Sequence, residues 1–168
     1  MNVSIAQLLE VLENLISIHQ TMLELAAQKT PVLVNNQVVE LNTIIHKENK
    51  LIKQIEELER MRVQLTGEYL ISRGYNPDPK VRVSDLIKII FKAEEKKALS
   101  EVQARLLDVM TEMKKQNEVN QKLIKQSLAF LDYSLDLFVK TPEQDAFYQH
   151  PHQSGYSSVR NGLFDTKA

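Results

Sequence analysis

The sequence predicts an all-α protein: an elongated antiparallel helical hairpin, a long third helix that completes a coiled-coil-like three-helix bundle, and a flexible C-terminal tail. The 168 residues include only Gly 4 and Pro 5, with 26% charged residues, which is typical of long helices rather than short strands joined by turns. Apolar residues recur at steps of three and four, the spacing of helices that pack at shallow angles. The length is that of one domain.

The first helix is predicted over residues 3–34. His19 lies on its apolar stripe, where we expect a core histidine rather than a ligand. Pro31 has no amide hydrogen and should kink or loosen the last turn, and Asn35–Asn36 can adopt left-handed conformations that close a tight turn. The stripe consists of Ile5, Leu8, Leu12, Leu15, His19, Met22, Ala26, Lys29 and Leu33.

The second helix is predicted over residues 37–71. Because its connection to the first helix is short, the two should be antiparallel neighbours. It ends before "SRGYNPDPKVRVS", where Gly74, Pro77 and Pro79 interrupt any helix. Its stripe consists of Leu41, Ile44, Glu48, Leu51, Ile55, Leu58, Arg62, Leu65 and Tyr69.

The C-terminal half is predicted to hold a short helix over residues 85–93 and a long one over 94–140. Ser84–Asp85 reads as an N-cap with an acidic first turn. From residue 141 the sequence contains Pro and Gly without periodicity. Residues 1–140 are therefore expected to form the bundle and 141–168 a flexible tail.

The long helix carries amides in its apolar stripe, which predicts a polar core layer made by Asn117 and Asn120 with Glu48 and Arg62 as candidate partners. Buried amides cost stability but favour a single register; a ligand or ion site is the alternative. The predicted stripe consists of Val102, Leu106, Val109, Met113, Asn117, Asn120, Ile124, Leu128, Leu131, Leu135 and Phe138.

The end of the same helix is apolar on a second side. Phe130, Tyr133 and Leu137 form a row about 160–200° from the bundle face formed by Leu128, Leu131, Leu135 and Phe138. A helix with two apolar faces needs neighbours on both sides, so the row is interpreted as a partner site, with internal or dimer packing as the alternative. In the tail, Leu163–Phe164–Asp165 resembles a short docking motif, expected to cover this row or to clasp the partner. The alternative is a solvated tail with incidental aromatic residues.

Several functions are disfavoured. A net charge of −1 argues against binding to nucleic acid through a basic face. The absence of Cys excludes thiolate metal sites and suits a reducing cytoplasm. Glu10 and Glu13 interrupt the first apolar run, so we expect no signal peptide or membrane insertion. His150 and His152 alone make a poor metal site. We therefore expect a cytoplasmic protein that is not an enzyme and has no cofactor or metal.

The chain resembles the FlgN-type flagellar export chaperones. The resemblance is carried by Met22–Arg62, "VRVSDLI", "NEVNQKLIKQSLAFLDYSLDLF" and the terminal "LFDTKA". Its strongest parts are Asn117–Ile124 and Leu163–Asp165. Pro31 and the Asn35–Asn36 turn depart from the family pattern and affect the bend of the hairpin.

This resemblance implies a cytosolic type III flagellar export chaperone that acts without ATP. Such a chaperone binds the C-terminal helices of hook-associated proteins (FlgK- and FlgL-like), prevents their premature assembly and delivers them to export gate components. The rival hypotheses are a structural coiled coil that homodimerises through the end of the long helix and a helical protein that binds lipid or nucleic acid. Because a homodimeric coiled coil is one of these hypotheses, we expect the protein to be either a monomer or a weak homodimer. The expected partner-binding residues are Leu128, Phe130, Leu131, Tyr133, Leu135, Leu137, Phe138, Leu163 and Phe164.

Overall fold

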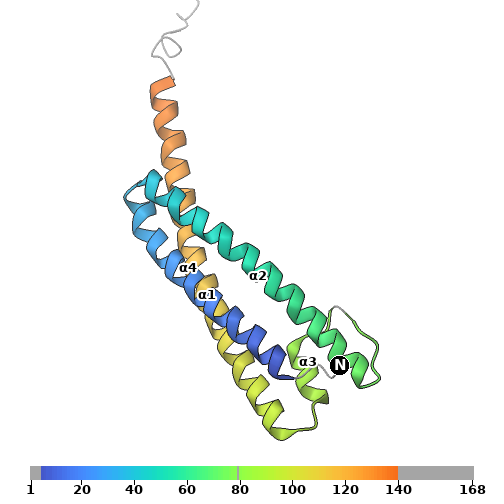
Figure 1. Ribbon diagram of the computed structural model, residues 1–168. Coiled ribbons are helices and arrows are strands. Elements are labelled where there is room, and N and C mark those ends of the chain that lie inside the picture. The colour runs from blue at the N-terminus through green and yellow to red at the C-terminus, as the bar shows by residue number, and fades with distance from the viewer. Residues whose placement is uncertain (1–4, 79, 140–168) are drawn as a thin grey trace, which may run out of the picture. The chain divides into compact units, whose positions relative to one another are not determined.

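The computed structural model describes residues 5–78 and 80–139, and these residues form helices and no strand. The helices are α1 (Ile5–Val34), α2 (Val38–Ser72), α3 (Val83–Ile89) and α4 (Ala93–Val139) (Figure 1). The predicted all-α class is confirmed. The chain divides into two compact units, Met1–Ala129 and Phe130–Ala168, and α4 contributes residues to both.

The core of the first unit centres on α1. Leu8, Leu12 and Leu15 of its predicted stripe are fully buried, and they share one helix face because they are spaced by three or four residues. Val11 and Ile16, which flank this stripe on opposite sides, are buried as well. A helix that is buried on two faces needs a neighbour on each side, and α2 and α4 supply them.

Two residues of α1, His19 and Pro31, take part in hydrogen bonds within or directly after the helix. His19 is a buried core histidine, as predicted, and its Nδ1–H donates to the carbonyl of Leu15 at 2.7 Å. The helix continues through Pro31 to Val34, and the carbonyl of Pro31 accepts the amide of Asn35 at 3.0 Å; the predicted kink stays a prediction. A proline removes its own donor but leaves its acceptor intact.

The hairpin between α1 and α2 closes as the sequence indicates. Asn36 adopts a left-handed conformation with φ 53°, which asparagine tolerates better than most residues. Lys29 of α1 and Glu48 of α2 form a largely buried ion pair, with Nζ and Oε2 2.5 Å apart. At the other end of α2, Gly74 takes φ 83°, and the amide of Tyr75 returns to the carbonyl of Leu70 at 2.9 Å.

The short helix α3 differs from the prediction at both ends. Its N-cap is Arg82 rather than Ser84. Asp85 lies in the first turn, as predicted, and its carboxylate accepts the backbone amide of Arg82 at 3.3 Å. The pKa of Asp85 lies below its ordinary value, mainly because its carboxylate accepts a hydrogen bond from Lys88. The hydrogen bond from the Arg82 amide is the second cause. The helix ends at Ile89 because buried Ile90 is extended, with ψ 128°, although no Gly or Pro marks this break.

Within the first unit, α4 runs parallel to α1 (Figure 1). Arg105 donates to the carboxylate of Glu13 near the start of both helices. Asn120 bonds to Ala26 and Thr30 further along both. Leu99 and Val102 of α4 are buried in the same core cluster as the α1 leucines. The third helix thus lies along the hairpin, as predicted.

Candidate functional site

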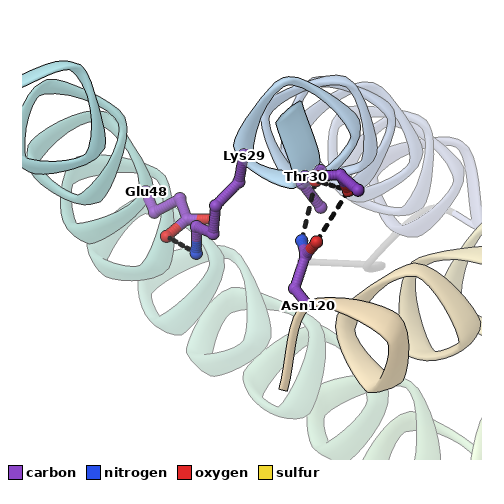
Figure 2. Close-up of polar contacts among 5 residues, drawn as sticks. Lys29, Thr30, Glu48 and Asn120 are labelled. Carbon is purple, nitrogen blue, oxygen red and sulfur yellow. Dashed lines mark hydrogen bonds and ion pairs between the residues drawn. The ribbon is translucent and has the colours of Figure 1, made fainter. Parts of the chain in front are cut away.

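A buried polar network connects α4 to α1. The hydroxyl of Thr30 donates to Asn120 Oδ1 and accepts from Gln116 Nε2, both at 2.7 Å. Asn120 Nδ2 donates to the carbonyl of Ala26 at 2.7 Å. Figure 2 shows the side chain of Asn120 reaching from α4 toward Thr30. With Asn120 only 1% exposed, its amide oxygen and nitrogen both have partners, as a buried amide requires.

This network confirms the buried position of Asn120 but corrects the rest of the predicted polar layer. Asn117 is exposed. The carboxylate of Glu48 pairs with Lys29, as Figure 2 shows, and Arg62 pairs with Glu59 at 2.9 Å. Neither charged residue therefore meets the amides.

The error at Asn117 comes from the register of α4. Beyond Met113 the buried side advances by three residues to Gln116 rather than by four. It thereby keeps a regular alternation of three and four, the spacing of a coiled-coil seam. We call this set of buried and half-buried residues the α4 seam. It consists of Leu99, Val102, Leu106, Val109, Met113, Gln116, Asn120, Leu123 and Ser127.

The final segment of α4, Phe130–Val139, is helical and exposes nearly all of its apolar side chains. Phe130 is 68% exposed and Phe138 84%. Ser134 is the half-buried residue of this segment, and its hydroxyl donates to the carbonyl of Phe130 at 2.8 Å. The exposed apolar residues are Phe130, Leu131, Tyr133, Leu135, Leu137, Phe138 and Val139.

These positions bear on the predicted partner site. Phe130, Tyr133 and Leu137 are exposed, as a partner site requires. Leu128, Leu131, Leu135 and Phe138 were expected to continue the bundle face, but they too are exposed. Leu123, Ile124 and Ser127 are half-buried, whereas Leu128 is exposed. Beyond Ala129 the residues on both predicted faces are exposed alike. Leu163 and Phe164 lie outside the described residues.

A cavity of about 660 Å³ opens between α1, the end of α2 and the start of α4. Its charged lining consists of Arg73, Lys92, Glu94 and Glu95, without a histidine or a metal-ligand cluster. Over residues 5–78 and 80–139, no group of three His, Cys, Asp or Glu side chains is placed to hold a metal ion.

The same described ranges contain no helix with the length and apolarity needed to span a bilayer.

Comparison with known proteins identifies the group to which this architecture belongs. The model of the FlgN protein family matches residues 1–154. The chain belongs to the FlgN family. It is 29% identical over 161 residues to "Uncharacterized protein YvyG" of Bacillus subtilis (strain 168), which covers 96% of this chain and 97% of that protein. No solved structure matches the chain.

FlgN proteins are flagellar export chaperones, and as a family they bind hook-associated proteins. The FlgN family is a family of chaperones and not of enzymes. The family match therefore confirms the resemblance carried by the sequence motifs.

Sequence reasoning missed several residues of the polar network and the seam. Thr30, Ala26 and Gln116 bind or position Asn120, but only Ala26 had been placed on the stripe of α1. A short side chain on an apolar stripe was the available signal, because it lets an amide on a neighbouring helix approach the backbone. Nothing in the sequence indicated that Ser127 and Ser134 lie on the buried or half-buried side of α4.

Proposed function

We propose that this FlgN protein is a cytoplasmic chaperone that binds the C-terminal helices of hook-associated proteins through the final segment of α4. It would keep those helices from assembling early and deliver them to the flagellar export gate. One observation supports the choice of site: a continuous helical segment, Phe130–Val139, exposes seven large apolar side chains in the described structure. Contiguous exposed apolar surface marks a site of protein contact.

The chemistry of the cargo suits such a site. A terminal helix that is unfolded before assembly carries an apolar stripe, which an exposed apolar helix can bury by helix-in-groove packing. Fully burying a large apolar side chain contributes about 1.5–3 kcal/mol. Ordering the cargo helix costs part of this energy, so the complex keeps a moderate affinity and can release its cargo at the gate.

The test is calorimetric titration with a synthetic peptide that carries the C-terminal helix of a hook-associated protein, either FlgK-like or FlgL-like. The test variant replaces Phe130, Leu131, Leu135 and Leu137 together by Ala. Alanine has the highest helix propensity, so helicity measured by circular dichroism should persist. We expect the affinity to fall at least about a hundredfold, because several buried side chains are lost.

The matched control replaces Leu107 and Val119 by Ala, since both are exposed on α4 within the first unit. This control should bind as the wild type does. An unchanged affinity in the quadruple variant would contradict the proposed site.

The same exposed segment also suits a homodimer, which is the structural alternative. Light scattering over a range of protein concentrations separates the two functions. A monomer that binds the peptide supports the chaperone. A dimer that dissociates in the quadruple variant and never binds the peptide supports the coiled coil.

A further inference from the structure

The helix α4 is longer than the helix on which it packs. Thr30 of α1 is level with Asn120 of α4, because the two side chains share a hydrogen bond of 2.7 Å. The helix α1 ends four residues after Thr30, at Val34. Since parallel helices rise equally per residue, α1 ends about level with residue 124 of α4. The seam of α4 therefore continues where α1 has stopped.

Counting on from Ser127 in the same steps of three and four reaches Phe130, Ser134 and Leu137. We call these three residues the extended seam. They occupy the same heptad positions that Leu99, Val102 and Leu106 use in the first unit. Phe130 and Leu137 are exposed and Ser134 is half-buried.

The other apolar residues of the segment are placed by the helical period of 3.6 residues. Leu131 and Phe138 flank the extended seam on one side, and Tyr133 flanks it on the other. Leu128, Leu135 and Val139 lie furthest away, about 130–175° around the axis from the middle of the extended seam. Exposure does not separate these groups, because Leu135 is 59% exposed and Leu137 61%. Only the register of the α1–α4 interface distinguishes them.

We propose that the cargo helix docks on the extended seam, in the position on α4 that α1 occupies further back. This inference rests on the proposed chaperone function and specifies how its site is used. It is supported by continuity with the α1–α4 interface: one unbroken helix carries the same spacing from a buried part into an exposed part. Leu128 and Leu135 then lie outside the contact.

The docking mode also defines the chemistry of the partner. At the seam position held by Leu99, Leu106 and Met113, residues 127 and 134 are serines. The hydroxyl of Ser134 already donates to the carbonyl of Phe130, so the partner helix does not need to provide a polar group at this position. A partner helix on the extended seam must fill the space above Ser134 to reach the packing density of an interface. The partner therefore carries a large apolar side chain that packs over Ser134.

The decisive experiment compares Leu137→Ala with Leu135→Ala in the full-length protein. The two variants make the same change two residues apart on equally exposed positions. With the hook-associated-protein terminal peptide, we expect Leu137→Ala to weaken binding about tenfold or more, as truncation of a buried contact does. Leu135→Ala should change it less than about twofold.

A second pair tests the space above the serine. Ser134→Leu should weaken binding about tenfold, because the added side chain occupies the volume reserved for the partner. Ser134→Ala should bind as the wild type does, and so should Ala129→Leu, which adds the same bulk about 140° around the axis from Ser134. The Leu and Ala replacements favour the helix, so circular dichroism should be unchanged in each.

The outcomes separate this inference from the proposed function. If the quadruple variant loses the peptide but Leu135→Ala weakens binding as much as Leu137→Ala, the chaperone site stands and the register is overturned. Improved or unchanged binding by Ser134→Leu also overturns it. If the wild type is a dimer that Leu137→Ala splits while peptide binding persists, the occupant of the seam is a second copy of the chain.

Discussion

Two parts of α4 share one periodicity and differ in their surroundings. From Leu99 to Ser127 the seam is buried or half-buried against the bundle, whereas Phe130 and Leu137 in the final segment are exposed. Both parts are helical, and both place apolar residues at steps of three and four. The difference arises from the length of α1, which ends about level with residue 124. Periodicity thus specifies a face of a helix, while the length of the neighbouring helix decides whether that face is covered.

The largest expected effect comes from comparing one Leu→Ala substitution in the buried part of α4 with one in its exposed final segment. Leu99, which is 0% exposed, loses packing on all sides when replaced by Ala. We expect Leu99→Ala to lower the free energy of unfolding by about 3 kcal/mol, within the range for buried leucines. Leu137→Ala, in the final segment, should lower it by less than about 0.5 kcal/mol. Urea denaturation measures both.

Equal losses in the two variants would contradict the contrast, because they would show that the final segment is packed in the free protein. The slope of the urea transition provides a control: it should be the same for both variants if each still unfolds in one step.

A smaller difference is expected between the two asparagines of α4. Asn120→Ala leaves the carbonyl of Ala26 and the hydroxyl of Thr30 without the amide that now bonds them. Leaving buried polar groups unsatisfied costs about 1–3 kcal/mol. Asn117→Ala is the matched control, and thermal or urea unfolding should show almost no loss for it because Asn117 is exposed. Comparable losses at both positions would favour the predicted register over the observed one.

The smallest effect is expected from the ion pair between Arg105 of α4 and Glu13 of α1. About half of each side chain is exposed, and exposed pairs contribute about 0–1 kcal/mol. Arg105→Gln should therefore change the unfolding free energy by less than 1 kcal/mol. The difference from wild type should shrink further as salt is added, because salt screens exposed charges. A salt-independent loss would show that the arginine stem contributes by packing.

Much of the fold could be predicted because its determinants are local. Asn36 closes the first turn and Gly74 ends α2, each with a positive φ that its residue type tolerates. The stripe of α1 is buried as the spacing indicates. The break after Ile89 was misplaced because it depends on an extended, buried Ile90 rather than on any residue that disfavours helix.

The candidate site was predicted less well, for a physical reason. Gln116 and Asn117 are both polar amides, so the sequence alone does not say whether the seam steps by three or by four after Met113. The choice is made by Thr30 on another helix, whose hydroxyl bonds Gln116. Asn120 lies on both the predicted stripe and the seam, but from Asn120 the prediction stepped by four to Ile124 where the seam steps by three to Leu123. That second step is why the predicted bundle face passed through Leu128 instead of Ser127.

The parallel packing of α4 on α1 has a consequence for the order of folding. The hairpin brings together residues that are close in sequence, as Lys29 and Glu48 are. The contact between Thr30 and Asn120 instead closes a loop of 90 residues. Longer loops cost more entropy to close, and non-local contacts form more slowly. The hairpin can therefore assemble while the ribosome is still making α4. The early hairpin shortens the time that the α2-facing apolar residues of α1 remain uncovered, and the final segment of α4 emerges after that hairpin has formed.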